Sequence, residues 1–257
     1  MSTIRLGHID LSFHAVSAAV VQRLLERAGH EVSVSAAPHE AMFKRYGAHE
    51  ADMLVSAWLP GSHDAYLKPY ADDTHYLGVL YEPYCIWGVP DYVPEDQVGS
   101  VADLARPEVA GRMEKRIQGI NPGAGISRFS AEIIREYALD ALGYNFQTGS
   151  EDACYRRFEQ AVEHKAWIVL PLWHPQFLHA RHRIRELHEP RGLLRGRDRA
   201  TLIAHKDCTR QLAPELVETL ASLHLGNAAV SQLDYLVCRE GKTPLEAADT
   251  WLKRHDA

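Results

Sequence analysis

Two tryptophans, each two residues before a proline, have the chemistry to bind a cation. Trp58 lies in the segment 56–63 (SAWLPGSH) and Trp173 in the segment 169–177 (VLPLWHPQF). Each leaves an apolar run that is typical of a buried strand, and ligands of open α/β sheets collect at the carboxyl ends of strands. Two facing indole rings attract a quaternary ammonium with their negative π-faces, worth up to ~2 kcal/mol per ring when desolvated. The alternative for each tryptophan is that it covers the core.

A glycine-rich turn could hold an anion. The segment 119–127 (GINPGAGIS) places Gly123, Ala124 and Gly125 between a predicted strand and the start of a predicted helix. Free backbone N–H groups and the positive end of the helix dipole together suit a carboxylate or a phosphate. The spacing matches neither GxGxxG nor GxxxxGK[ST], so nucleotide binding has little support. A bare turn is the alternative.

The elements that would position these residues form two α/β blocks. In the first block, strands and helices alternate, which requires right-handed crossovers and a parallel sheet covered by helices. Its predicted strands are 4–9, 31–35 and 53–57, and its predicted helices are 15–28, which Gly29 ends, and 38–48. Trp58 follows the third strand directly.

The second block begins after residues 89–92 (VPDY), where we expect the chain to cross between lobes. It contains predicted strands 116–120, 167–172 and 201–204 and predicted helices 126–142 and 152–164. Three predicted helices close the chain, over 214–223, 228–239 and 244–255, the last with Thr243 and Pro244 as N-cap and first residue. Two blocks and a helical tail indicate two lobes, with the tail on the first.

Bulk composition excludes some classes of function. The 257 residues, 46% of them hydrophobic, suffice for one large domain or two lobes. The net charge of -6 argues against a nucleic-acid partner, because neutralising phosphates requires a basic face. The basic stretch 181–199 also contains acidic residues and predicts a solvated surface connection. We expect thiols rather than disulfides or a metal site at the scattered cysteines, which are Cys85, Cys154, Cys208 and Cys238.

The chain has no run near the ~20 apolar residues that cross a bilayer. Its first residues, MSTIRLGHIDLSFH, lack a basic region followed by an apolar one, so no signal peptide is visible. We therefore expect a protein of the periplasm or another extracytoplasmic space if a signal has been removed, and a cytoplasmic protein otherwise.

Six blocks, in their order and spacing, resemble the glycine betaine/proline betaine (quaternary amine) substrate-binding proteins of ABC importers. They are LLERAGHEV, ADMLVSAWLPGSHDAYLKPY, GVPDYV, GINPGAG, WIVLPLWHPQFLHARHRIRELHEP and TPLEAADTWLKRHDA. The resemblance extends over nearly the whole length. It implies an α/β fold of the two-lobed periplasmic-binding-protein kind (type II), with a ligand cleft between the lobes. We expect residues 1–90 and 201–257 to form lobe 1 and residues 91–200 to form lobe 2.

The resemblance also implies roles for residues. The family holds a methylammonium head group between tryptophan rings, and Trp58 and Trp173 match the cage positions. Backbone amides and polar side chains hold the carboxylate, and Gly123 and Gly125 match the glycine-rich loop. Some members carry an aromatic residue inside that loop, where this chain has Ala124. The cage then either has two walls or is completed by another ring.

Five aromatic residues could complete it: Phe13, His14, Tyr81, Tyr84 and Trp87. We favour Tyr84, which lies just before the expected crossing between lobes, and His14, which lies at the first strand-to-helix turn. His14 and His174 could also donate a hydrogen bond to a carboxylate. Each is one of 15 histidines, so an incidental position is the alternative.

The resemblance predicts the substrate-binding component of an ABC importer, which binds a small quaternary-ammonium or related zwitterionic compatible solute such as glycine betaine and catalyses nothing. Its partners would be that ligand and the transporter's permease, with no nucleic acid and no cofactor. The chain would be a monomer. Members of the family normally carry a lipid anchor or a signal sequence.

Two other functions stay open. A ligand-sensing protein on the same fold in the cytoplasm would need no signal peptide. An enzyme is less well supported, because the chain has no GxSxG, no HExxH and no recognisable Cys-His arrangement. His179, His182 and His188 could form a metal cluster near Glu186, but the intervening arginines make the stretch too cationic for a metal. We therefore predict no catalytic and no metal-binding residues.

Overall fold

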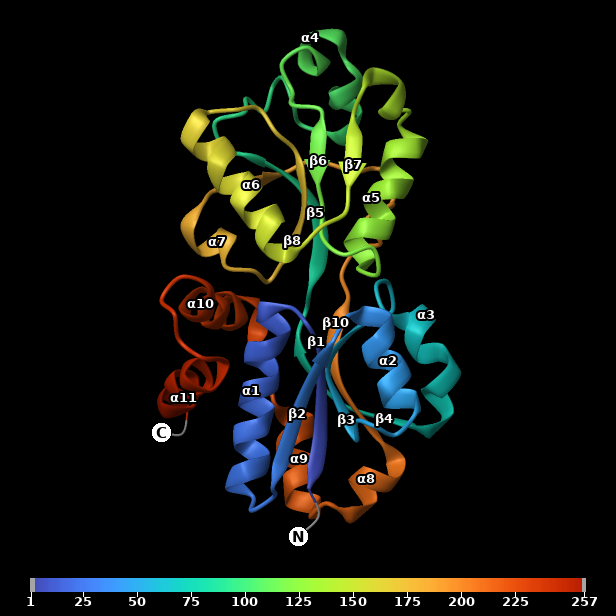
Figure 1. Cartoon of the computed structure of the whole chain (residues 1–257), viewed down its shortest axis with the longest axis vertical. Helices are drawn as coiled ribbons and strands as arrows, with labels where there is room; N and C mark the ends of the chain where they lie inside the picture. The colour runs from blue at the N-terminus through green and yellow to red at the C-terminus, as the bar shows by residue number, and fades with distance from the viewer. Residues whose placement is uncertain (1–2, 256–257) are drawn as a thin grey trace. The chain divides into compact units, whose positions relative to one another are not determined.

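The computed structural model describes residues 3–255. The chain forms two compact units, whose elements are labelled in Figure 1. Unit 1 comprises Met1–Pro83, Pro175–Ala180 and Arg197–Ala257, and unit 2 comprises Tyr84–His174 and Arg181–Gly196. The chain thus leaves unit 1 after Pro83, whereas the sequence analysis placed this division after residue 90.

Unit 1 is built on a five-stranded sheet in the order β2-β1-β3-β10-β4. Its strands are β1 (Ile4–Ile9), β2 (Val32–Ala37), β3 (Met53–Leu59), β4 (Thr74–Tyr81) and β10 (Arg199–His205). β1 pairs in parallel with β2 and β3, as predicted for the first block. β10 runs antiparallel to β3 and β4, so the sheet is mixed rather than wholly parallel.

The direction of β10 follows from the place where the chain returns to unit 1. Ala200 pairs with both Trp58 and Tyr81, so β10 begins beside the carboxyl ends of β3 and β4. A strand that starts there must run antiparallel to both neighbours. His205, at the other end of β10, pairs with Thr74 and donates its backbone N–H to the Asp52 carbonyl oxygen.

Helices cover both faces of the sheet of unit 1. They are α1 (Ser12–Arg27), α2 (His39–Gly47), α3 (Asp64–Leu67), α8 (Lys206–Gln211), α9 (Pro214–Ser222), α10 (Gly226–Cys238) and α11 (Pro244–His255). The chain passes from β1 out to β2 and back past β1 to β3, so right-handed crossovers place α1 and α2 on opposite faces. α10 and α11 pack on α1, and α3 packs on α2 (Figure 1).

Two helix ends follow from the local sequence. α1 is followed by Gly29, whose φ of 88° suits the left-handed position that ends a helix. α11 is preceded by a capping box, in which the Thr243 N–H donates to Glu246 Oε2 at 2.8 Å and the Glu246 N–H donates to Thr243 Oγ1 at 3.2 Å. These ends confirm the predicted helix stop and N-cap.

Unit 2 contains a three-stranded antiparallel sheet and a separate parallel pair of strands. The sheet, in the order β8-β5-β9, consists of β5 (Tyr84–Pro90), β8 (Leu170–His174) and β9 (Ile184–Glu186), and the pair consists of β6 (Arg116–Gln118) and β7 (Asn145–Gln147). The α-helices of unit 2 are α4 (Pro107–Ala110), α5 (Gly125–Glu136) and α6 (Glu151–His164). α7 (Leu178–Arg181) spans a boundary between the units in the sequence.

The basic stretch 181–199 is more than a solvated connection. Its strand β9 pairs with β5. Asp198 is buried, and its carboxylate accepts the backbone N–H groups of Gly61 at 2.5 Å and of Ser62 at 3.1 Å. The surface prediction is wrong at these places, because the charge pattern does not show which carboxylate meets the N–H groups of a distant turn.

The four cysteines are free thiols, as predicted. Cys85 and Cys154 are buried, and burial raises the pKa of the Cys154 thiol. Over residues 3–255, no helix is both long enough and apolar enough to cross a bilayer.

Candidate functional site

Trp58 lies near the carboxyl end of β3, where the sequence analysis expected a ligand-binding residue. It is 6% exposed. Its indole N–H donates to the Tyr81 hydroxyl at 3.1 Å, and its backbone N–H donates to His63 Nδ1 at 2.9 Å. Hydrogen bonds therefore fix both the side chain and the backbone of Trp58 within unit 1.

Four rings surround Trp58 in unit 1. The centroids of Phe13, His14 and His63 lie 5.4, 5.7 and 6.1 Å from the Trp58 ring. Tyr81 lies 6.4 Å away at an interplanar angle of 87°. Phe13 and His14 belong to the first turn of α1, which follows β1, and the parallel pairing of β1 with β3 brings that turn beside Trp58. We call these five residues the Trp58 cluster.

Ser56 connects two members of the Trp58 cluster. Its Oγ lies 2.6 Å from His14 Nδ1 and 2.6 Å from the Tyr81 hydroxyl. Ser56 has a φ of 65°, a left-handed conformation that costs a residue other than glycine about 1–3 kcal/mol. The pairing of β3 with β10 is irregular here, between Thr201 and Ile203, so the strand bulges at Ser56. Such strain is concentrated at functional sites.

Two ionisable members of the Trp58 cluster are neutral near pH 7. Burial lowers the pKa of His14 well below its usual 6.5, and the nearby His39 and His8 lower it further. Burial raises the pKa of Tyr81 to about 12. A neutral imidazole does not repel a cation, and the surrounding π-faces attract one. The Trp58 cluster is therefore suited to a ligand group that carries its own positive charge.

Trp173 lies in β8 of unit 2 and is 1% exposed. Its ring packs beside Tyr155 of α6, with the centroids 5.9 Å apart. The Tyr155 hydroxyl donates to Glu151 Oε1 at 2.6 Å. Tyr155 was not among the residues predicted from the sequence, and its contact with Trp173 appears only in the structure.

Tyr84 and His174 form a separate ring pair in unit 2. Tyr84 pairs with His174 across the β5–β8 ladder, and Cys85 pairs with Trp173. Opposed residues of an antiparallel ladder point to one face, and successive residues point to opposite faces. Tyr84 and His174 therefore stack, 4.7 Å apart, on the face away from Trp173. Glu186 Oε1 accepts from the Tyr84 hydroxyl at 3.1 Å and lies 3.5 Å from His174 Nε2.

The glycine-rich segment forms the start of α5. Ala124 is the N-cap residue, with φ -67° and ψ 143°, and no side chain caps this end by a hydrogen bond in the described chain. The Ala124 N–H donates to the Asn121 carbonyl at 3.2 Å, and the Arg128 guanidinium donates to the Gly123 carbonyl at 2.5 Å. The first N–H groups of a helix, from Gly125 onward, have no intrahelical acceptor. With an arginine beside them, they suit an anion.

Trp87, another candidate for the cage, belongs to the core of unit 2. It is fully buried in β5, and its Nε1 donates to Ser130 Oγ at 2.9 Å. This hydrogen bond satisfies the indole N–H inside the core. Trp87 therefore has a structural role.

A family model matches residues 2–254 of the chain, and it describes the substrate-binding domain of the ABC-type glycine betaine transport system. The chain belongs to this family. The family predicted from the sequence is thereby confirmed.

A curated relative is the glycine betaine/carnitine transport binding protein of Listeria monocytogenes serotype 1/2a (strain 10403S). It is 24% identical to the chain over 151 residues, which are 59% of this chain and 50% of the relative. The matched region thus spans about half the length of that relative.

Solved structures show the fold of the family. Lactococcal OpuAC, closed and complexed with glycine betaine, has a TM-score of 0.86 at 24% identity and covers 100% of this chain and 97% of its own. The glycine betaine/L-proline-binding protein ProX of Borrelia burgdorferi has a TM-score of 0.86 at 18% identity, over 98% and 93%. A choline-binding protein complexed with choline has a TM-score of 0.84 at 18% identity, over 99% and 89%. These likenesses confirm the predicted two-lobed α/β substrate-binding fold.

The ligand-binding roles of single residues stay predictions. Unit 1 brings His14 to Trp58, whereas in unit 2 the ladder separates Tyr84 from Trp173. Ser56 could not be predicted as a site residue, because a serine inside an apolar strand looks like any other small residue. Only its φ and its two short hydrogen bonds distinguish it.

Proposed function

We propose that the chain is the ligand-binding component of an ABC importer and that its ligand is a betaine-type zwitterion or a related quaternary ammonium compound. The observation that carries this proposal is the Trp58 cluster, in which rings lie 5.4 to 6.4 Å from one indole and His14 and Tyr81 are uncharged. The names of the relatives, which bind glycine betaine, carnitine or choline, support the same class of ligand.

The chemistry of a quaternary ammonium explains why rings would bind it. The group has no N–H to donate, so it offers only methyl surface and a delocalised charge. An aromatic face accepts both, at up to ~2 kcal/mol per ring when water is excluded. Trp58, with His14 nearby, is proposed to contact the head group, and Trp173 of unit 2 is proposed as a second ring for the ligand.

A carboxylate on the ligand is proposed to bind at the start of α5. Gly123, Ala124 and Gly125 lead into the first turn of α5, where no described side chain caps the helix and the helix dipole favours a negative group. His174 and Tyr84 are weaker candidates for the carboxylate, because Glu186 already contacts both and would repel it.

The chain is proposed to bind and release its ligand unchanged, as a monomer outside the cytoplasm, and to deliver it to the permease of its transporter. Membership of a substrate-binding family supports this role. Proton NMR of the ligand before and after prolonged incubation checks that no chemistry occurs.

Titration calorimetry with quaternary ammonium ligands and isosteres that lack the cationic nitrogen tests the proposed function. Glycine betaine is compared with 3,3-dimethylbutyrate, in which carbon replaces nitrogen, and choline is compared with 3,3-dimethylbutanol. We expect at least one of the two ammonium compounds to bind and its carbon isostere, which lacks the positive charge, to bind at least about tenfold more weakly. Equal affinity within each pair, or no binding of any methylated ammonium compound, would contradict the proposal.

A further inference from the structure

Unit 1 contains a group of side chains able to ligate a metal at the end of the sheet opposite the Trp58 cluster. His49 follows α2, Asp73 ends the 3-10 helix Lys68–Asp73, and His205 ends β10. Their donor atoms all lie within 4.8 Å of one another. Along β3, residues 53 and 58 are roughly 17 Å apart, at about 3.3 Å per residue, and this length separates the group from Trp58. The two sites therefore share no residue.

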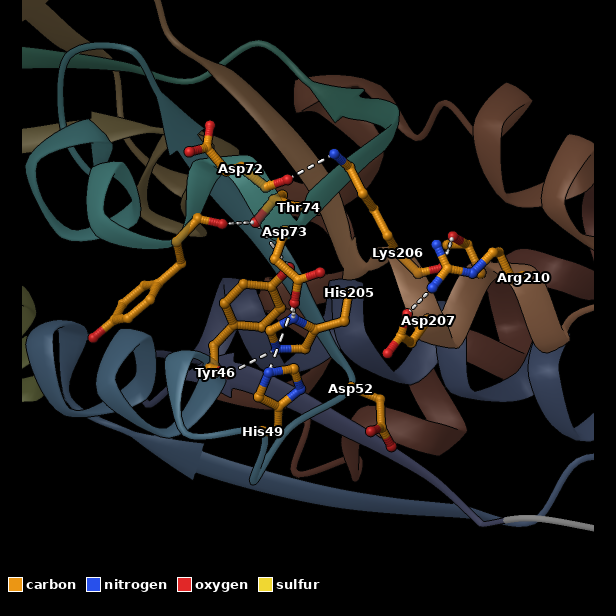
Figure 2. A network of polar contacts seen from close by, with 12 residues as sticks. Tyr46, His49, Asp52, Asp72, Asp73, Thr74, His205, Lys206, Asp207 and Arg210 are labelled. Carbon is orange, nitrogen blue, oxygen red and sulfur yellow. Dashed lines mark hydrogen bonds and ion pairs between the residues drawn. The ribbon is translucent and has the colours of Figure 1, made fainter.

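His205 is held in one orientation. Its side chain is 4% exposed, and its ring is stacked on the rings of Tyr46, 4.1 Å away, and His49, 3.9 Å away (Figure 2). Nε2 lies 2.7 Å from the Tyr46 carbonyl oxygen. A carbonyl oxygen only accepts, so Nε2 carries the hydrogen. A backbone carbonyl on one ring nitrogen is the arrangement that orients a histidine to ligate a metal through the other nitrogen.

The other nitrogen of His205 faces a carboxylate. Nδ1 lies 2.7 Å from Asp73 Oδ2. With the hydrogen on Nε2, the neutral ring presents a lone pair at Nδ1. Two acceptors at this distance repel each other unless a positive charge is shared between them. A metal ion bound by both groups supplies that charge, and a second ring proton is the rival explanation.

His49 completes the donor set. Its Nε2 lies 3.7 Å from Asp73 Oδ2, and its backbone φ of 55° is the left-handed position past a helix end that usually favours glycine. With this backbone conformation, the His49 ring stacks on the His205 ring. Donors around a tetrahedral ion lie roughly 3.4 Å apart when each is about 2.1 Å from the metal. The side chains of His49 and Asp73, which are 57% and 47% exposed, would rotate to this separation when the ion binds.

We propose that His49, Asp73 and His205 bind a divalent transition-metal ion of the Zn²⁺ class. Two imidazole nitrogens and one carboxylate oxygen are ligands that suit Zn²⁺ and its Co²⁺ substitute. A cavity of ≈ 390 Å³ adjoins His49 and His205 and admits the ion and a water ligand. The bound ion connects the end of α2 with the ends of the 3-10 helix and of β10. Two of its ligands, Asp73 and His205, are 132 residues apart in the sequence. Its effect is to stabilise unit 1.

Two charged side chains near this site, Arg5 and Lys206, already have partners. Arg5 donates to Asp52 Oδ2 at 3.1 Å, and Lys206 donates to the Asp72 carbonyl at 2.6 Å (Figure 2 shows Asp52, Asp72 and Lys206). Cys208 also lines the cavity, but burial raises the pKa of its thiol to about 11. A protonated thiol is a poor metal ligand. The donor set is therefore two histidines and one aspartate.

Titration calorimetry of the chelator-treated full chain with Zn²⁺ tests the proposal. We expect one equivalent to bind and to raise Tm, reversibly with EDTA, because an ion that binds only the folded state stabilises it. Asp73→Asn and His49→Gln should each weaken binding at least about tenfold. Co²⁺ should give the visible absorption of a four-coordinate ion in the unaltered chain and lose it in both variants.

His164→Gln is the matched control, because His164 is exposed and its ring bonds only locally, to the Gln160 carbonyl at 2.8 Å. It should leave Zn²⁺ binding unchanged. Equal weakening by the control, undiminished affinity in Asp73→Asn and His49→Gln, or substoichiometric binding would overturn the proposal. Metal-free unfolding midpoints show whether the variants fold. Affinity for glycine betaine should not change in any of them, so the result is independent of the proposed ligand.

Discussion

The indole of Trp58 is positioned before any ligand arrives. Tyr81 fixes its N–H, His63 fixes its backbone, and Phe13 and His14 pack beside the ring. A ring that is already immobilised loses little conformational entropy on binding, so more of the cation–π energy is retained as affinity.

Removal of the Trp58 ring should therefore weaken ligand binding. We expect Trp58→Ala, and likewise Trp173→Ala, to raise the Kd for a quaternary ammonium ligand at least tenfold, or about 1.4 kcal/mol. Trp58→Phe should lose less, because it keeps a π-face. Titration calorimetry provides the measurement.

Trp167 offers a matched control for these substitutions. It is half-buried in unit 2, and its ring stacks on the Arg112 guanidinium at 3.6 Å, not on the proposed ligand-binding residues. Trp167→Ala should leave the Kd unchanged. If Trp58→Ala and Trp173→Ala both bind as tightly as the unaltered chain, the aromatic cage has no part in binding.

Among the elements, β4 packs against the backbone of α9 at a glycine, Gly78. A Cβ on Gly78 would lie 2.5 Å from the Ala221 carbonyl oxygen and 2.9 Å from that of Leu220. Both obstacles are backbone atoms of α9, which cannot rotate aside as a side chain could. The distance between the helix and the strand therefore depends on the absence of a side chain at residue 78.

Gly78→Ala should destabilise the chain by about 1–3 kcal/mol, the usual cost of forcing extra atoms into a packed interface. Urea unfolding followed by circular dichroism measures the change. Gly111→Ala is the control, because Gly111 has an ordinary φ of -68° and its Cβ would meet one carbonyl oxygen at 3.3 Å. Equal stability of the two variants would show that α9 shifts without cost.

Local sequence patterns did not predict the end of α5 or the strands β4 and β5. The helix predicted over 126–142 ends at Glu136, because Ala138 adopts a φ of 50° that breaks the helix before the short turn Asp140–Leu142. The strands β4 and β5 were not predicted, because neither alternates cleanly between buried and exposed residues. β4 is defined by its pairing with β10, and β5 by its pairing with β8 and β9.

For the molecule as a whole, buried histidines link stability to pH. Burial lowers the pKa of His14 well below 6.5 and also lowers the pKa of His8. Between the folded-state pKa and 6.5, the unfolded chain binds more protons than the folded chain, so the stability falls as the pH drops through this window. Asp234 acts oppositely, because burial raises its pKa to about 6 and the folded chain then gains stability on acidification.

The contribution of His14 is isolated by His14→Asn, which keeps a polar atom near Ser56 but does not titrate. From about pH 7.5 to about pH 5, the unaltered chain should lose more free energy of unfolding than this variant. Urea unfolding across the pH range measures both curves. Parallel curves would mean that His14 keeps the same protonation in the folded and unfolded chain.

Local sequence was enough to predict the order β1–α1–β2–α2–β3, the stop at Gly29, the cap at Thr243 and the place of Trp58 at a strand end. Each depends on residues within a turn or two of one another, so the pattern of side chains carries the information. The blocks that mark the family are likewise continuous stretches of chain. These features were confirmed.

Folding in three dimensions decided the rest. Three features involve residues far apart in the chain. They are the contact of Ser56 with His14, the placement of Tyr84 and Trp173 on opposite faces of their sheet, and the contact of Asp73 with His205. The first two depend on strand pairing, of β1 with β3 and of β5 with β8, and the third depends on where β10 ends in the sheet of unit 1. A one-residue change of register would turn the strand residues among them to the opposite face, and no short stretch of sequence encodes that choice.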